Sequence, residues 1–409
     1  MEGILRGDII NRIMNILFSL LRLAKDLKSS GMYLDLAQEF VKNGHQVTVI
    51  CGTDEPTTFK EEFGMRVLRV KSKPVLYVKN MIQKGIGMAT LPFYYKRAYN
   101  KYLRNEQFDW IVMPTPPITM IDFVKKVKKK TGAKFYMVLR DIHPQSSASL
   151  GEIKRQWMIN YLYRRSDLGY RLADVVGCMS QANIDFIQKE HNIPSTTKCR
   201  VLYNWMNYQP YVEEDFSDLR EKYNLKGKFL VLFGGNIGQG QRVENIADLA
   251  KHYLPNDNIV FVIIGKGIKK DYLQQLAKDQ GLSNILFLSY MPREDYLRFV
   301  KSADLGLISI HEKNAAPTCP SKALSYMSLK IPMLAMINSN NDYGQIVEEQ
   351  AKAGYWAVGS DKEKVYALFD KLYANPDLRK QMGENGYRFY CEHLTTEKVF
   401  AEMIKQMNE

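Results

Sequence analysis

The chain has 409 residues, of which 45% are hydrophobic and 25% charged, as in ordinary globular proteins. This length is too great for one comfortable hydrophobic core, so we expect two α/β domains of about 200 residues. Five scattered cysteines without a Cys-x-x-Cys pair indicate a reducing compartment and exclude a disulfide framework. The first apolar run, at 13–21, falls short of the roughly 18 residues that cross a bilayer, which excludes a membrane-spanning protein.

The net charge of +13 is concentrated in the first half of the chain. Residues 1–205 contain 32 Lys and Arg against 18 Asp and Glu, whereas residues 206–409 contain 25 against 26. A solvated basic surface is one explanation. An asymmetry this complete favours a polyanionic partner for the first half: nucleic acid, anionic lipid, or a phosphorylated substrate at a membrane.

Strand and helix patterns alternate along the chain. Residues 14–20 predict a strand, 32–41 a helix and 47–50 a second strand, which is a βαβ opening. Further strands are predicted at 110–113, 135–139, 174–178, 229–233, 259–264, 285–288, 305–308 and 333–336. The pattern restarts after Trp205, so two doubly wound parallel sheets are expected, with ligands at the carboxyl ends of the strands. Residues 1–13 are set aside as an N-terminal extension, because Met14 is a possible native start.

The most informative segment is the glycine-rich turn that follows the predicted strand at 229–233. Gly234, Gly235, Gly238 and Gly240 permit close approach of the backbone to a ligand, and the helix expected next offers unpaired N–H groups. Two later segments have related properties. Ile264-Gly265-Lys266-Gly267 is a strand ending in a glycine turn, and Pro320-Ser321-Lys322 opens a helix that Ser321 is expected to cap. A lysine in a first helical turn is unfavourable unless an anion binds nearby.

These segments, taken in order, resemble the nucleotide-sugar half of the family-4 retaining glycosyltransferases with the GT-B fold. The first half resembles the bacterial surface-polysaccharide branch of that family, through Gly44-His45-Gln46-Val47, Thr115-Pro116-Pro117, Arg140-Asp141-Ile142-His143-Pro144-Gln145, Cys178-Met179-Ser180-Gln181-Ala182-Asn183 and Leu202-Tyr203-Asn204-Trp205. The resemblance covers nearly the whole chain from Met14.

The resemblance implies two Rossmann-like α/β domains facing a cleft. Residues 14–205 would bind the acceptor and residues 206–385 the nucleotide sugar, while 386–409 would form a C-terminal helix that packs back on the first domain. The implied reaction moves a sugar from a nucleotide diphosphate sugar, expected to be a UDP-sugar, to a lipid-linked or cell-surface glycan, without metal or cofactor. The implied partners are the nucleotide sugar, a lipid-diphosphate-linked or glycan acceptor and an anionic membrane surface, without nucleic acid. The implied location is cytoplasmic, on the inner face of the cell membrane.

The donor site implied by the resemblance lacks some of the family's usual charged residues. Neutral Asn236 and Gln241 stand where the family often has Arg and Lys, which leaves Arg242 and Lys322 as the cations at hand. Ser325 and Pro317 stand at the positions of the paired glutamates. The candidate donor-binding residues are Gly235, Asn236, Gly238, Gln241, Arg242, Gly265, Lys266, Ser321, Lys322 and Ser325.

On the acceptor side, Asp141 and His143 follow a predicted strand and are the candidate catalytic residues. One of them would orient or deprotonate the acceptor hydroxyl; otherwise Asp141 caps a turn and His143 is a packed or surface imidazole. Ser30 and Gly31, before the first helix, are candidates for binding an acceptor phosphate, although Ser30 is equally well explained as a helix cap.

Basic and aromatic residues are interleaved over 69–104 and 154–171, as at a membrane interface or a single-stranded nucleic-acid site. The lysines at 125–130 are expected to form a solvated helix end. Three alternatives to a transferase remain: an epimerase or hydrolase of the same fold, a non-catalytic polyanion-binding protein, and a dehydrogenase. The dehydrogenase is disfavoured because the Gly-x-Gly-x-x-Gly spacing is not met at 234–240.

Overall fold

The computed structural model describes residues 12–26, 31–73 and 81–409. Ser30 and residues 1–11 of the N-terminal extension lie outside this range. The chain divides into two compact units. The first unit comprises Met1–Pro144, Ile153–Asn207 and Thr396–Glu409, and the second comprises Gln145–Glu152 and Tyr208–Thr395.

The first unit is built on a sheet of eight strands in the order β3-β4-β2-β1-β5-β6-β7-β8. All neighbouring strands are parallel except β3, which pairs antiparallel with β4. Parallel strands are covered on both faces, which explains their continuous apolar sequences. The strands are β1 (Asn15–Leu20), β2 (Gln46–Thr53), β3 (Thr58–Glu62), β4 (Met65–Lys71), β5 (Trp110–Thr115), β6 (Lys134–Leu139), β7 (Val175–Cys178) and β8 (Lys198–Val201).

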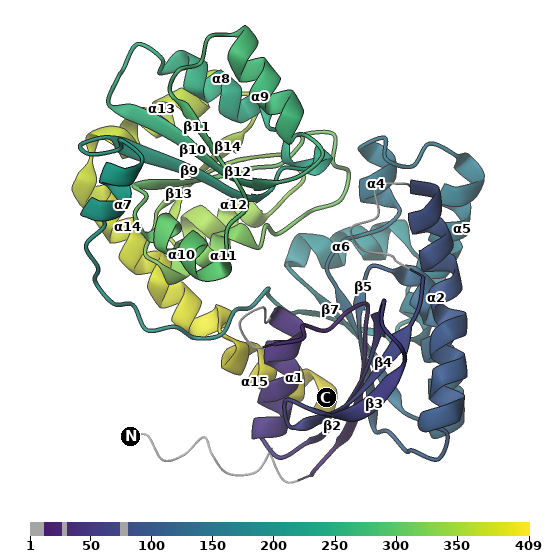
Figure 1. Cartoon of the computed structure of the whole chain (residues 1–409). Helices are drawn as coiled ribbons and strands as arrows, with labels where there is room; N and C mark the ends of the chain where they lie inside the picture. The colour runs from purple at the N-terminus through teal and green to yellow at the C-terminus, as the bar shows by residue number, and fades with distance from the viewer. Residues whose placement is uncertain (1–11, 27–30, 74–80) are drawn as a thin grey trace. The chain divides into compact units, whose positions relative to one another are not determined.

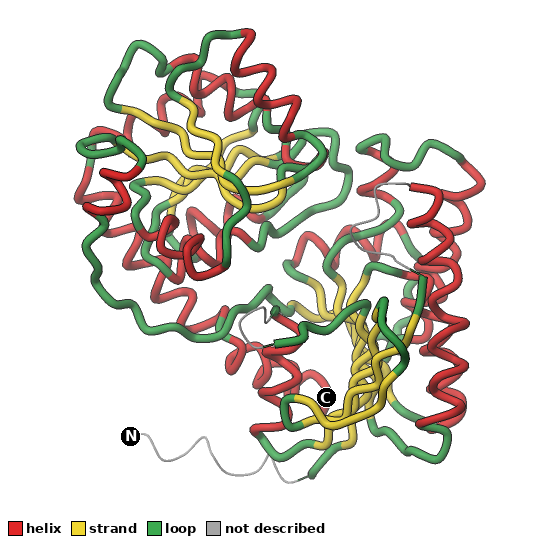
Figure 2. The backbone as a smooth tube through the Cα atoms, viewed as in Figure 1, coloured by secondary structure: helices red, strands yellow, loops and turns green. Residues whose placement is uncertain are grey.

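Helices lie on both faces of this sheet (Figures 1 and 2). The first of them, α1, buries Leu34, Leu36, Ala37 and Phe40 at helical spacing and ends before Gly44, whose φ is +84°. The helical segments of the unit are α1 (Met32–Lys42), α2 (Met81–Tyr102), the 3₁₀ turn η1 (Ile118–Met120), α3 (Ile121–Thr131), α5 (Gln156–Leu172), α6 (Gln181–Glu190) and α15 (Thr396–Asn408).

The last helix, α15, returns the chain to the first unit and packs against α1. The rings of Phe40 and Phe400 meet edge to face with centroids 4.8 Å apart. Gln406 on the same helix donates a hydrogen bond to the carbonyl of Val201 (2.9 Å) and accepts one from the hydroxyl of Tyr136 (2.5 Å). Residues 400 and 406 therefore belong to the core of a unit whose other strands and helices come from the first half of the chain.

The second unit contains an entirely parallel sheet of six strands in the order β11-β10-β9-β12-β13-β14. Its core contains aromatic side chains, with Phe229, Phe261 and Tyr253 around Phe369. The strands are β9 (Phe229–Asn236), β10 (Ile259–Lys266), β11 (Ile285–Leu288), β12 (Leu305–Ser309), β13 (Met333–Ile337) and β14 (Gly354–Val358).

The helical segments of this unit comprise two that precede β9 and others that follow the strands, as a parallel sheet requires. They are α4 (Gln145–Ser149), α7 (Ser217–Lys222), the 3₁₀ turn η2 (Gln239–Gln241), α8 (Glu244–His252), α9 (Lys270–Asp279), α10 (Arg293–Lys301), α11 (Lys322–Ser328), α12 (Tyr343–Gln345), the π-helical η3 (Ile346–Gln350), α13 (Lys362–Ala374), α14 (Pro376–Phe389) and the π-helical η4 (Tyr390–Leu394). Within the described residues, none of the helices in either unit combines the length and hydropathy needed to cross a membrane.

Candidate functional site

The strand order of the second unit reverses at β9, which lies between β10 and β12. In doubly wound sheets, ligands bind outside the carboxyl ends of the strands at such a reversal. The segments that follow β9 and β12 are the glycine-rich turn and the loop that leads to Lys322. The topology therefore brings together two of the segments that the sequence singles out.

The glycines at the ends of β9 and β10 allow two backbones to approach closely. Gly235 and Gly265 are paired across the two strands. A Cβ on Gly265, whose φ is +151°, would lie 1.9 Å from the Gly235 carbonyl oxygen, and a Cβ on Gly267 would lie 2.2 Å from that of Ile237. Gly235 is exposed and has no side chain, so the end of β9 presents bare backbone there, next to the exposed Asn236.

The glycine turn begins later than the sequence suggests. Strand β9 continues to Asn236, so Gly234 and Gly235 belong to the strand, and only the segment from Ile237 to Val243 connects it to α8. Gly234 is buried, and a Cβ there would lie 2.3 Å from the hydroxyl of Tyr296. Its small size makes room for a neighbouring tyrosine. Gly238 precedes η2, and a Cβ on Gly238 would lie 2.7 Å from the side-chain nitrogen of Asn236.

Lys322 reaches the turn from the first residue of α11. Its Nζ donates a hydrogen bond to Oε1 of Gln241 (2.6 Å) and lies 3.5 Å from the ring centroid of Phe233. No carboxylate in the described residues forms an ion pair with it. Burial lowers the pKa of this ammonium to about 7, because the charged form loses hydration. A bound anion would stabilise the charged form of Lys322 in this environment.

The second expected cation, Arg242, already has a partner. Its guanidinium pairs with Glu312 on the loop after β12, which sequence reasoning did not foresee. The Arg242 carbonyl accepts a hydrogen bond from Ser309 Oγ (2.9 Å), and Asn245 Nδ2 donates to the same hydroxyl (3.1 Å). Arg242 therefore fixes the turn to the neighbouring loop, and its charge is neutralised by Glu312. The charge of Lys322 has no such carboxylate partner among the described residues.

The remaining donor-side candidates lie near these segments. Lys266 is exposed at the end of β10, with Nζ 4.5 Å from the ring centroid of Tyr290. Ser325 is partly buried and lies three residues after Lys322, on the same side of α11. Ser321 does not cap α11, contrary to expectation: its side chain makes no capping hydrogen bond and its backbone is already helical, with φ −66° and ψ −18°.

In the first unit, the acceptor-side candidates follow β6 and precede α1. Asp141 is exposed just beyond the carboxyl end of β6, and His143 is partly buried, its carbonyl accepting a hydrogen bond from Ser166 Oγ (2.8 Å). Gly31 is exposed, and its carbonyl accepts hydrogen bonds from the N–H groups of Leu34 (2.9 Å) and Asp35 (3.1 Å) at the start of α1.

Arg140, the residue before Asp141, holds this segment in place. Its side chain is buried, donates to the carbonyl of Leu202 (3.1 Å) and lies over the ring of Trp205 at 4.6 Å. The sequence pattern identified 140–145 and 202–205 as separate motifs. The structure shows that Arg140 connects them.

Sequence reasoning missed three residues that shape the donor side: Phe233 beneath Lys322, Tyr296 beside Gly234, and Glu312 paired with Arg242. Phe233 reads as an ordinary core residue of a strand. Glu312 has no local pattern that assigns it a partner 70 residues away. These contacts are seen only in the structure, where strands and loops that are distant in the sequence lie side by side.

Comparisons with known proteins agree with this architecture. The family described as Glycosyltransferase Family 4 matches residues 32–209, and the family described as Glycosyl transferases group 1 matches residues 215–389. A probable glycosyltransferase of Pseudomonas aeruginosa, WbjE, is 23% identical over 317 residues, covering 74% of this chain and 76% of its own. A Campylobacter jejuni N-acetylgalactosaminyltransferase, named for a diphospho-undecaprenol acceptor, is 21% identical over 239 residues, covering 57% and 59%.

Among solved structures, Anabaena HepE in complex with UDP and glucose superimposes with a TM-score of 0.68. Its sequence is 15% identical, and the superposition covers 97% of this chain and 99% of HepE. This similarity concerns the fold. The two family matches meet near the change from the first unit to the second. The chain belongs to the GT-B glycosyltransferases, with Glycosyltransferase Family 4 matching its first half and Glycosyl transferases group 1 its second.

Proposed function

We propose that this glycosyltransferase moves a sugar from a UDP-sugar to a lipid-diphosphate-linked glycan, with retention of anomeric configuration and without a metal. The observation that carries the donor assignment is the Lys322 ammonium, seated against Gln241 at the reversal of the sheet without a carboxylate partner among the described residues. The named ligands of HepE and the named acceptor of the Campylobacter relative support a nucleotide donor and a lipid-linked acceptor.

The chemistry requires that negative charge on the departing diphosphate be stabilised as the sugar leaves. Preorganised cations and backbone N–H groups do this best where water is excluded. Lys322 would supply the cation, and the exposed backbone at Gly235, which pairs with Gly265, would permit close approach of the donor. Asp141 or His143 would bind or deprotonate the acceptor hydroxyl, and Gly31 would contact an acceptor phosphate.

The proposal is tested by measuring UDP release from a panel of UDP-sugars with and without lipid-diphosphate-linked glycans. We expect release only when one donor and a matching acceptor are both present. Release from the donor alone at the same rate would instead favour a hydrolase, and interconversion of the donor sugar would favour an epimerase.

Replacing Lys322 tests the donor site directly. Lys322→Met keeps an unbranched side chain but removes the cation, and we expect kcat/KM to fall by about 10²-fold or more. Lys278→Met, at an exposed position in the last turn of α9, removes the same charge from a residue outside the candidate site and should leave kcat/KM unchanged. Equal activity of the Lys322 variant and the Lys278 control would disprove the assignment of Lys322.

A further inference from the structure

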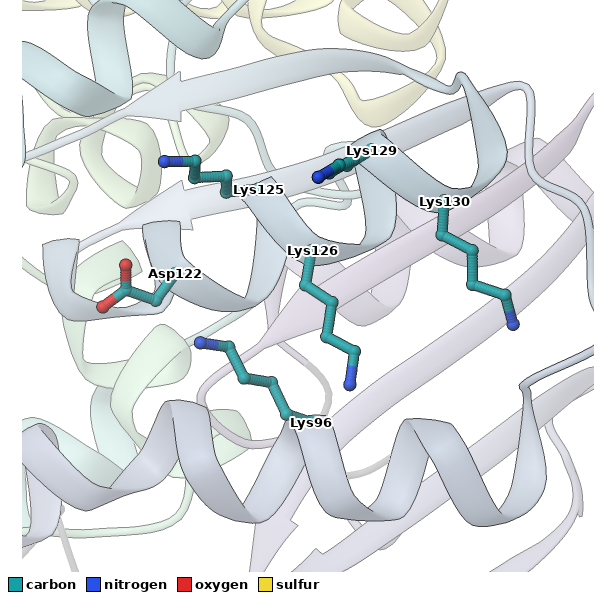
Figure 3. Close-up of a pocket in the computed structure, with 6 residues that line it drawn as sticks. All are labelled: Lys96, Asp122, Lys125, Lys126, Lys129 and Lys130. Carbon is teal, nitrogen blue, oxygen red and sulfur yellow. The ribbon is translucent and has the colours of Figure 1, made fainter.

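A surface hollow lies between α2 and α3 of the first unit, on residues to which the proposed transfer reaction gives no role. Its lining consists of Lys96 on α2 and, on α3, Asp122, Lys125, Lys126, Lys129 and Lys130. Figure 3 shows Lys126 extending from α3 toward α2 and Lys96 extending from α2 toward α3. We call these residues the lysine hollow. The solvated helix end expected at 125–130 is thus one wall of a concave surface.

The positive charge of the lysine hollow is not balanced from within. Its one carboxylate, Asp122, is paired with Arg165 of α5. None of its five lysines forms an ion pair with any carboxylate in the part of the chain that the structure describes. Burial, together with the charges of Lys96 and Lys130, lowers the pKa of Lys126. Like charges held this close favour an anion that touches several of them at once.

Apolar side chains lie exposed on α2 beside the lysine hollow. Phe93 is 64% exposed and lies one turn before Lys96, so the two side chains are neighbours on the helix surface. Ile86, two further turns back on the same face, is 44% exposed. Large apolar side chains next to clustered cations are typical of surfaces that enter the headgroup region of a membrane.

We propose that the lysine hollow binds phosphate headgroups of an anionic bilayer, with Phe93 and Ile86 entering the boundary between headgroups and acyl chains. This inference deepens the proposed function, because a lipid-linked acceptor is found in such a bilayer. A lipid occupant is favoured over nucleic acid because Ile86 has no ring on which a base could stack, whereas any apolar side chain gains by contact with lipid. Membrane binding then explains why the excess positive charge lies in the first half of the chain.

The test is sedimentation of the full chain with vesicles of phosphatidylglycerol and phosphatidylcholine, compared with pure phosphatidylcholine. The triple variant Lys126→Ala, Lys129→Ala, Lys130→Ala removes three charges from α3 without lowering helix propensity. We expect its apparent affinity for the anionic vesicles to fall by about tenfold or more. The wild type should bind the anionic vesicles, should not bind pure phosphatidylcholine, and should dissociate as salt is raised.

The matched control is Lys251→Ala, Lys278→Ala, Lys380→Ala, which removes the same charge from exposed positions in the second unit. It should bind vesicles like the wild type. Equal losses of vesicle affinity in both triple variants would show that binding depends only on the net charge of the chain, and would overturn the proposal. So would binding of inorganic pyrophosphate by the wild type without any binding to vesicles, which indicates a soluble anion, or binding to oligonucleotides but not to vesicles.

Phe93→Ser separates insertion from charge. We expect this variant to bind anionic vesicles more weakly with an unchanged salt dependence. An unchanged affinity would show that Phe93 does not enter the bilayer. Failure of the vesicle test is distinguishable from failure of the proposed function, because UDP release with a detergent-solubilised acceptor needs no bilayer. The α3 triple variant should retain that release.

Discussion

At the scale of single residues, Lys322 combines a hydrogen bond, an aromatic contact and a low pKa in one place. Its ammonium loses hydration beside Phe233 and recovers one contact through Gln241. Because its pKa is about 7 in the folded chain and near 10.5 when the chain is unfolded, the unfolded chain binds more protons between these values. Burial of Lys322 therefore lowers the free energy of unfolding at and below neutral pH, and this loss disappears as pH rises toward 10.5.

The same titration predicts a pH dependence of donor binding. The protonated form of Lys322 attracts a diphosphate, so the affinity for UDP-glucose, or for another UDP-sugar that the panel selects, should fall by roughly tenfold from about pH 6 to about pH 8.5. The phosphates of a UDP-sugar do not titrate in this range, so isothermal calorimetry isolates the protein group. Lys322→Met should bind weakly with a flat profile. A wild-type profile that is equally flat would rule out titration of Lys322 in donor binding.

Gly265 illustrates a second residue-scale constraint, the close approach of two strands. Gly265→Ala places a Cβ against the Gly235 carbonyl and should lower the free energy of unfolding in urea by about 3 kcal/mol or more. Gly281→Ala is the matched control, because Gly281 also has positive φ (+65°) but open space around a Cβ. It should cost only about 1 kcal/mol. Similar losses in the two variants would show that backbone conformation, and not the clash, determines the effect.

At the scale of elements, the sequence predicts strands well where they are buried on both faces. The strand expected at 333–336 matches the fully buried β13 to within one residue, and that at 229–233 covers all but one residue of the buried part of β9, which runs on to the exposed Gly235 and Asn236. Strands β3, β4, β8 and β14 were not predicted. In β4, Arg66 and Arg69 interrupt the apolar pattern, yet Arg69 is buried because Glu62 and the carbonyls of Leu23 and Ala24 satisfy its guanidinium.

The donor-side elements were predicted better than the contacts between their side chains. Periodicity and glycine spacing locate the turn after β9 and the start of α11, because both depend on neighbouring residues in the chain. The pairing of Arg242 with Glu312 depends on the order of strands in the sheet, which local patterns do not contain. The capping role expected of Ser321 was wrong for a local reason, since its backbone is already helical.

The packing of α15 on α1 gives an element-scale prediction. Phe400 is 6% exposed and meets Phe40, which is fully buried. Phe400→Ala should lower the free energy of unfolding by about 3 kcal/mol, measured in urea, through lost burial and a cavity. Lys405→Ala, exposed on the same helix, should change it by less than about 0.5 kcal/mol. Equal stability of the Phe400 variant and wild type would mean that α15 does not stabilise the unit.

At the scale of the whole molecule, two doubly wound parallel sheets were predicted, since alternation of strands and helices specifies this class. The sheet of the second unit is entirely parallel, and that of the first departs from the prediction only at β3, which pairs antiparallel with β4. Composition also indicated which half has the excess positive charge. It gave no indication that five lysines would line one hollow with their acid already paired to Arg165. That arrangement depends on how α2, α3 and α5 pack on the sheet, and hence on contacts between distant parts of the chain.

The return of residues 396–409 to the first unit has a consequence for synthesis on the ribosome. The first half of the chain emerges early, but the helix that covers Phe40 is made only after Tyr208–Thr395 of the second unit. Until α15 has been made, apolar surface on α1 stays without its native partner, although domains usually fold as units in the order of their synthesis. A nascent chain arrested before Thr396 should therefore bind holdase chaperones through its first unit, even after the second unit has emerged.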